Sequence, residues 1–96
     1  MPALDEPLKP AAAKRLIRGI IQAGTVSLSK HAQEEMTKDD LNVVDCVNIL
    51  RGGVVAPGEL ERGSWRYRVS TPRICVVVAF RSDVELVIVT AWRSPQ

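Results

Sequence analysis

The hydrophobic pattern of this chain changes its period once, at Gly52-Gly53, and that change limits the folds open to it. Before this point, apolar residues recur every three or four positions, as on one face of a helix. After it, they alternate with polar residues or run continuously, as in strands. Helices followed by consecutive strands predict an α+β domain with N-terminal helices on one face of a three- to four-stranded antiparallel sheet.

Three helices are expected in the first half. Residues 11–23 form an amphipathic pattern that Gly24 ends. Residues 25–28 predict a short extended piece that leads into Ser29. Ser29 is expected to be the N-cap of a second, short helix over residues 30–36. The third is expected to take Thr37 as its cap and to end at residue 50 or 51.

The second half predicts the sheet. Apolar or alternating segments separated by turn residues span residues 54–56, 64–70, 73–80 and 85–92. Two or three short helices cannot cover both faces of such a sheet. We therefore expect its second face to be partly open, concave and available to a ligand.

With 96 residues the chain is long enough for one domain, residues 1–96, and too short for two. Residues 1–10 predict a flexible lead-in and residues 94–96 a tail. The N-terminus does not resemble a signal peptide, and the longest apolar run, residues 74–80, is far too short to cross a membrane. No membrane association is therefore expected.

Two cysteines, Cys46 and Cys75, lie in apolar surroundings. Such residues are more often buried thiols than partners in a disulfide. A reduced, cytoplasmic setting is therefore expected.

Positive charge is concentrated in the second half of the chain. Residues 1–50 carry six basic and seven acidic side chains, whereas residues 51–96 carry seven basic and four acidic ones. All seven basic residues of the second half are arginines, and five of them fall in residues 62–81, which contain no acid. Arginine suits bidentate phosphate contact and stacking on bases. Arginine-rich sequences also occur in GC-rich genomes, so a phosphate-binding face is favoured but not required.

One strand combines these features. In residues 64–70, Trp65, Tyr67 and Val69 fall on one side, while Arg66 and Arg68 fall on the other with two serines. This pattern predicts either an anion-binding platform above a core or a solvated sheet edge.

Candidate catalytic groups are few. His31 is the only histidine and begins the second expected helix, where a neutral imidazole could act as a general base or simply pack locally. Glu35, one helical turn later, could pair with it. No zinc-binding spacing, glycine-rich phosphate loop or dinucleotide fingerprint is present, so we expect neither a metal nor a cofactor.

Several arginines could gather around one phosphate and stabilise the charge of its transition state. Arg66 and Arg68 share a strand face, and Arg73 and Arg93 lie at the ends of neighbouring strands. Tyr67 could serve as an acid, a base or a stacking ring, although on a regular strand it faces away from these arginines. Trp65 and Trp92 could stack on bases or belong to the core.

A resemblance to a known family adds to this interpretation. The chain resembles the bacterial family called domain of unknown function 4258, which opens on the pattern S-x-H-A-x-x-R/E-M. The matching segments are Leu28-Ser29-Lys30-His31-Ala32-Gln33-Glu34-Glu35-Met36, Gly52-Gly53-Val54, Trp65-Arg66-Tyr67-Arg68-Val69, a valine-rich strand and Val89-Thr90-Ala91-Trp92-Arg93. The similarity covers residues 16–93.

That family is similar to the RelE/ParE toxin superfamily and, within it, to MqsR-type mRNA interferases. The resemblance implies a RelE-like fold and a toxin that cleaves RNA, free or on the ribosome, without a metal. It also implies a cognate antitoxin protein as partner. The residues we assign to such a site are His31, Tyr67 and Arg68 as catalytic groups, with Arg66, Arg73, Arg93 and Trp92 binding the substrate.

Two other functions stay open. The low net charge of +2, and Glu35 where the family often has arginine, favour a non-catalytic protein-interaction module of the same fold. A ParE-like inhibitor of gyrase is the third alternative.

Overall fold

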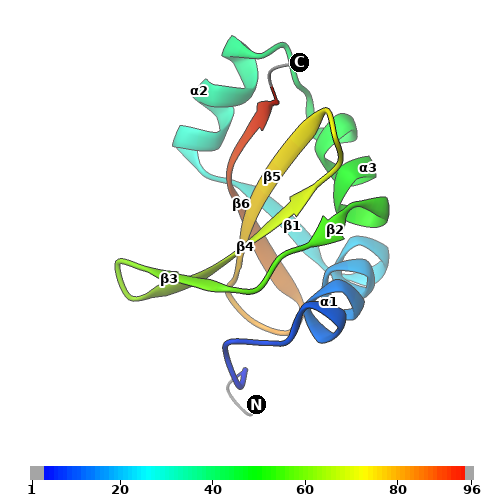
Figure 1. The fold of residues 1–96 in the computed structure, drawn as a ribbon, viewed down its shortest axis with the longest axis vertical. Coiled ribbons are helices and arrows are strands. Elements are labelled where there is room, and N and C mark those ends of the chain that lie inside the picture. Colours follow the sequence, from blue (N-terminus) through cyan, green and yellow to red (C-terminus); the bar gives the residue numbers. More distant parts are fainter. Residues whose placement is uncertain (1–3, 95–96) are drawn as a thin grey trace.

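The chain folds into an open, mostly antiparallel sheet with three helices, and the computed structural model describes residues 4–94. The strands lie in the order β1-β6-β5-β4-β2, and β3 pairs with β4 outside this row (Figure 1). The elements are α1 (Pro10–Ala23), β1 (Thr25–Leu28), α2 (Lys30–Lys38), α3 (Val43–Gly52), β2 (Val54–Val55), β3 (Glu59–Glu61), β4 (Ser64–Ser70), β5 (Ile74–Phe80) and β6 (Glu85–Arg93). The expected α+β class is confirmed.

The expected sheet of three or four antiparallel strands was too small. β1 lies parallel to β6, with Thr25 opposite Glu85, and β3 pairs antiparallel with β4. The extended piece expected over residues 25–28 is confirmed as β1, but its four residues do not reveal the strand with which they pair. The β3 sequence Glu-Leu-Glu has weak strand propensity. Both strands form because the neighbouring strand offers a ladder of hydrogen bonds.

The helices agree with the sequence except where α3 begins. The side-chain oxygen of Asn42 accepts from the Asp45 backbone N–H (2.9 Å), and the Asp45 carboxylate accepts in return from the Asn42 N–H (3.1 Å). Thr37, the expected cap, instead lies inside α2, where its hydroxyl donates to the Gln33 carbonyl (2.8 Å). The expectation was wrong because α2 continues for two residues beyond Met36.

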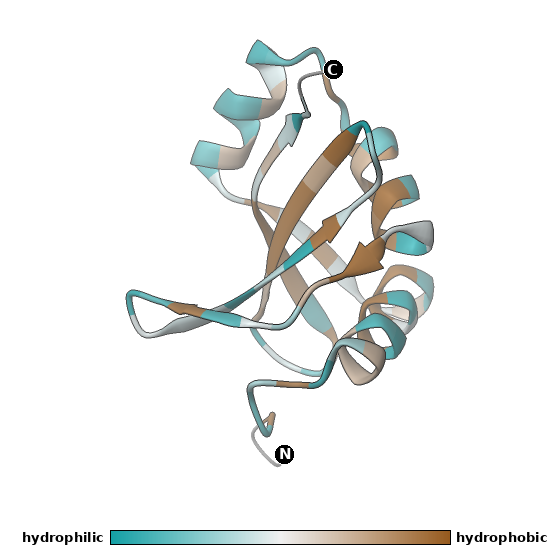
Figure 2. Ribbon diagram, viewed as in Figure 1, coloured by the Kyte–Doolittle hydropathy of each residue, from teal (hydrophilic) through white to brown (hydrophobic). Residues whose placement is uncertain are grey.

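The core lies between the sheet and the pair α1 and α3, which cover one face (Figure 1). Figure 2 shows β5, the middle strand of this row, as hydrophobic along most of its length. Among the described residues, the opposite face is less covered, because α2 packs mainly against β6. Fully buried side chains include Ile17, Leu50, Tyr67, Val69, Val76, Val78, Leu86 and Ile88.

The two ends of the chain were expected to be a flexible lead-in and a tail. The lead-in expected over residues 1–10 lies partly outside the described residues. In its described part, Leu8 packs against the core. The helix α1 already begins at Pro10. The expected tail also lies mostly outside them, although the Ser94 N–H donates to the Arg73 carbonyl (2.8 Å).

Both cysteines are buried free thiols, as expected. Burial raises the pKa of each, and the nearby Asp45 carboxylate adds to this effect at Cys46. No helix within residues 4–94 is long and apolar enough to cross a membrane.

Gly24 sets the turn from α1 into β1 because the chain there passes close to the end of the β5–β6 loop. Its N–H donates to the Ile20 carbonyl (2.7 Å), and the next N–H, of Thr25, donates to the Val84 carbonyl (2.9 Å). A Cβ atom at Gly24 would overlap that same Val84 carbonyl. Any side chain at this position therefore forces β1 or the loop to shift.

We expect Gly24→Ala to lower the free energy of unfolding by about 1–3 kcal/mol, since overlap with a backbone atom cannot be relieved by a rotamer change. Gly19→Ala is the matched control, because a Cβ there meets nothing within 4 Å. In the middle of α1 it should raise stability by about 0.5–1 kcal/mol. Urea denaturation followed by circular dichroism measures both, and equal effects would contradict this account of Gly24.

Candidate active site on the open sheet face

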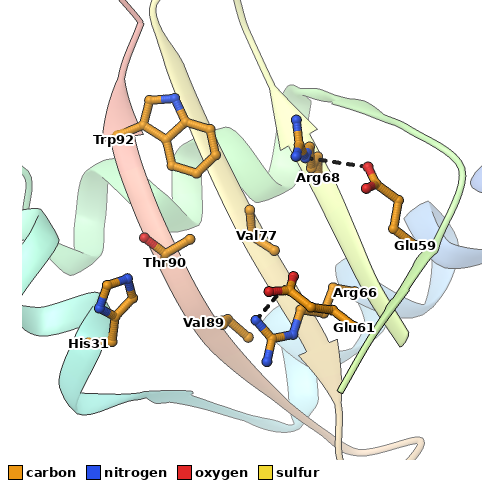
Figure 3. Close-up of a pocket in the computed structure, with 9 residues that line it drawn as sticks. All are labelled: His31, Glu59, Glu61, Arg66, Arg68, Val77, Val89, Thr90 and Trp92. Atoms are coloured by element: carbon orange, nitrogen blue, oxygen red, sulfur yellow. Dashed lines mark ion pairs between the residues drawn. The ribbon is translucent and has the colours of Figure 1, made fainter. Parts of the chain in front are cut away.

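A pocket of about 250 Å³ lies on the sheet face opposite α1 and α3. α2 contributes one wall and the β3–β4 hairpin the other, with β5 and β6 forming the floor (Figure 3). Its lining residues are His31, Glu59, Glu61, Arg66, Arg68, Val77, Val89, Thr90 and Trp92. The pocket brings together four of the predicted site residues, His31, Arg66, Arg68 and Trp92.

The pleat of β4 places both arginines in this pocket. Tyr67 and Val69 are fully buried on the helix-covered face, so their neighbours must point the other way. The Arg66 side chain is 25% exposed and that of Arg68 is 56% exposed. Arg68 lies opposite Val77 of β5, which forms the apolar floor between the two walls.

Two carboxylates that were not expected from the sequence, those of Glu59 and Glu61, also line the pocket. Arg66 Nη1 lies 3.5 Å from Glu61 Oε2, and Arg68 Nε lies 3.5 Å from Glu59 Oε1 (Figure 3). A tight turn causes this pairing, since Arg62 and Gly63 have φ values of 52° and 78°, as a two-residue hairpin turn requires. The sequence signal for these two carboxylates was the alternation Glu-Leu-Glu directly before this turn, which places both glutamates on one face of a strand.

Arg66 is not fully satisfied by its carboxylate. Its Nε–H is shielded from water and has no hydrogen-bond partner among the described residues. A buried donor left without an acceptor costs about 1–3 kcal/mol. An oxygen-rich ligand that reached this guanidinium would recover that energy.

His31 reaches the pocket because Ser29 fixes the start of α2 to β6. The Ser29 hydroxyl accepts from the Ala32 N–H (2.9 Å) and donates to the Val89 carbonyl (2.9 Å). One side chain thus caps the helix and holds it against the strand. The imidazole consequently lies beside Thr90, across Val89 from Arg66 (Figure 3).

Glu35 pairs with a lysine and not with His31, the partner suggested by its position on the helix. Its carboxylate lies 3.2 Å from Lys38 Nζ, one helical turn further along α2. Glu35 also does not line the pocket that holds His31.

Tyr67 lies on the wrong face for the catalytic role we expected. Its hydroxyl donates to Glu6 Oε2 (2.9 Å) and accepts from the Leu8 N–H (2.9 Å), and the side chain is fully buried. The regular alternation of β4 separates it from the two arginines beside it. Tyr67 therefore anchors the segment before α1 and is not part of the pocket.

Arg93 and Arg73, both expected to bind substrate, do not line the pocket. The Arg93 guanidinium donates to two carbonyls at the end of α2, those of Asp39 (2.8 Å) and Asp40 (3.1 Å). It therefore ties the C-terminus of α2 to β6. Arg73 lies exposed in the turn before β5. Trp65 is half-buried and packs against the core.

Comparisons with family models, curated proteins and solved structures find no match to this chain. Within residues 4–94, no group of three or more histidine, cysteine, aspartate or glutamate side chains is placed to hold a metal ion. The groups available in the pocket are therefore one imidazole, two guanidiniums, two carboxylates, a threonine hydroxyl and an indole.

The buried environment of Tyr67 leads to a prediction about the pKa of its hydroxyl. Burial raises its pKa from 10.0 to about 12, and the hydrogen bond to the Glu6 carboxylate adds to the rise while the Leu8 N–H opposes it. Because Tyr67 is the only tyrosine, absorbance at 295 nm reports its ionisation alone. We expect a midpoint near pH 12 in the folded chain and near pH 10 in urea.

The same shift gives stability a pH dependence. A raised folded pKa contributes stability that is complete below pH 10 and is lost as the pH rises through about 12. The loss should reach roughly 2–3 kcal/mol, at 1.36 kcal/mol per pKa unit. Tyr67→Phe should remove this part of the dependence, and a folded-state midpoint near pH 10 would contradict the burial of the hydroxyl.

Proposed function

We propose that this chain is a toxin-like, metal-independent endoribonuclease that holds an RNA phosphodiester in the pocket. The observation that carries the proposal is the grouping of His31 with Arg66 and Arg68 on the open sheet face. An imidazole for proton transfer and guanidiniums for phosphate charge are the groups that phosphodiester cleavage needs in the absence of a metal. The resemblance to the RelE-like toxins points to the same chemistry.

The two arginines suit a single strand of nucleic acid. They lie two residues apart on one face of β4, about 6.6–6.8 Å along the strand. This spacing is close to that of consecutive phosphates in an extended strand. The planar fork of each guanidinium can then bind one phosphate.

The rest of the pocket suits a base. Trp92 is partly exposed in β6 and lines the pocket together with the apolar side chains of Val77 and Val89. Stacking of a base on an aromatic ring contributes about 1–3 kcal/mol and tolerates any base. Trp92 therefore favours binding without strict sequence selection.

Cleavage requires two proton transfers on opposite sides of the phosphorus. One group takes the proton of the ribose 2′-OH, the 2′-oxygen attacks, the bond to the 5′-oxygen breaks, and a second group protonates that leaving oxygen. With Tyr67 on the other face, the pocket offers His31 and the carboxylates for these roles. We assign the base to Glu61, whose carboxylate lies across Val89 from the imidazole, and the acid to protonated His31 (Figure 3).

The products of this reaction are a 2′,3′-cyclic phosphate and a 5′-hydroxyl. Arg66 and Arg68 stabilise the extra negative charge of the pentavalent transition state. His31, which gave up its proton to the leaving oxygen, regains one from solvent, and the carboxylate returns its proton to solvent.

A protein-interaction module is the second candidate, and the β3–β4 hairpin favours it. Leu60 at the centre of β3 is 60% exposed, and β4 is the only strand that pairs with β3 in the described part of the chain. A partner segment could add to this edge by backbone hydrogen bonds. RNA binding that weakens steeply with added salt supports the nuclease, whereas no salt-dependent RNA binding supports the module.

The nuclease is tested by substituting the two arginines and the histidine of the pocket. We expect Arg66→Gln and Arg68→Gln to lower the cleavage rate about 10- to 100-fold, and His31→Gln about 100-fold or more. End-labelled RNA, incubated with the purified chain alone and with ribosomes, should yield fragments that end in a 2′,3′-cyclic phosphate.

Arg81→Gln is the matched control for Arg68→Gln. Arg81 also lies 3.5 Å from a glutamate, Glu85, and its side chain is 60% exposed, but it is outside the pocket. Its cleavage rate should equal that of the unsubstituted chain. Intact RNA in both assays, or equal rates for all four variants, would overturn the proposed nuclease.

A further inference from the structure

The charges of the pocket are already balanced before any ligand binds. Arg66 and Arg68 carry two positive charges, and the β3 residues Glu59 and Glu61 carry two negative ones. Each carboxylate faces one guanidinium, so the anion site is occupied by anions of the chain itself (Figure 3). We call residues 59–61 the acidic arm.

The acidic arm is held weakly by the rest of the fold. It forms three residue pairs with β4 and, within residues 4–94, pairs with no other strand. Leu60, its central residue, is 60% exposed and so provides little apolar burial. Segments with few buried apolar contacts open at low free-energy cost.

Its ion pairs are also easy to exchange. Both N–O distances are 3.5 Å, longer than the roughly 2.7–2.9 Å of a strong charge-assisted hydrogen bond. The Glu59 and Glu61 side chains are 63% and 61% exposed, so water already reaches them. A carboxylate that moved away would regain full hydration, while the guanidinium would gain a phosphate.

The unpartnered Nε–H of Arg66 also favours the exchange of carboxylate for phosphate. The pairing with Glu61 uses Nη1 and leaves Nε without an acceptor. The Glu61 carboxylate does not reach Nε, whereas a phosphate that is not tethered to β3 can accept from both nitrogens of one guanidinium edge. Exchange of carboxylate for phosphate therefore improves the hydrogen bonding of the arginine.

We propose that the acidic arm is a built-in competitor for the anion site: Glu59 and Glu61 hold the two arginines at rest, and a nucleic-acid phosphate binds by displacing them. This inference rests on the proposed function, because it concerns the same arginines. It makes the arm a determinant of selectivity. Ligands with two consecutive phosphates displace both carboxylates, whereas a single small anion displaces one.

Displacement also links binding to catalysis. In the resting pocket the Glu61 carboxylate is engaged with Arg66. When a phosphate takes its place on the guanidinium, the carboxylate is released beside the bound nucleotide. The assigned base thus becomes free only after the substrate is bound.

The test measures affinity for a short, fluorescently labelled 2′-O-methyl oligoribonucleotide, which lacks the 2′-OH and cannot be cleaved. The variant is Glu59→Gln with Glu61→Gln, which keeps side-chain size and removes both negative charges. Exposed ion pairs of this kind compete weakly, so we expect binding about 3- to 10-fold tighter at low salt. Fluorescence anisotropy gives the affinity, and circular dichroism confirms that the variant is folded.

Asp83→Asn with Glu85→Gln is the matched control. It raises the net charge of the chain by the same amount, and both residues lie in or beside the β5–β6 turn, outside the pocket. Its affinity should change much less than that of the arm variant. An equal gain in both double variants would show a general charge effect and overturn the competitor.

Failure of this inference can be told apart from failure of the nuclease. If the unsubstituted chain cleaves RNA but the arm variant binds the oligonucleotide no tighter than the control, the competitor alone is overturned. If no variant binds the oligonucleotide and RNA stays intact, the nuclease and the competitor both fall. Tighter binding by the arm variant supports the competitor even where cleavage is lost, because Glu61 is also the assigned base.

Discussion

The alternation of β4 between two environments is the constraint on which the rest of the molecule depends. Tyr67 and Val69 are fully buried beneath α1 and α3, and burial of side chains of this size contributes roughly 1.5–3 kcal/mol each. A slip of one residue would expose both and bury Arg66 and Arg68 instead. Since unpaired buried charges are far more costly than the lost burial, the hydrophobic core itself decides which face carries the arginines.

The histidine reaches the same face through contacts at both ends of α2. The Ser29 hydroxyl joins the start of the helix to β6, and the Arg93 guanidinium joins its end to the same strand. A helix of nine residues has little stability of its own. These two polar attachments therefore keep His31 at the edge of the pocket, and Arg93 serves the site by holding α2 in place.

The pocket contains groups that suit phosphate binding together with carboxylates that oppose it. Its arginines are suited to phosphate, yet Glu59 and Glu61 cancel their charge when no ligand is present. A chain with a net charge of only +2 can then carry a nucleic-acid site without a strongly basic surface. Under the proposed function, the low net charge, which by itself favoured a non-catalytic module, is therefore compatible with phosphate binding. In that case Arg66 and Arg68 stay paired with carboxylates until a phosphate binds.

Local patterns determined the α+β class, the extent of α1, the turn at Gly24 and the opposite facing of Tyr67 and the arginines. Each depends on residues close in the chain, through helical period, strand alternation or a steric limit on a turn. Only the tertiary structure decided the contacts between distant segments, because one sequence position does not reveal its partner across the sheet. Such contacts placed β1 parallel to β6, brought Glu59 and Glu61 to the arginines, and turned Arg93 toward α2. They also bound the Tyr67 hydroxyl to Glu6, some 61 residues away, where the sequence had suggested a catalytic group.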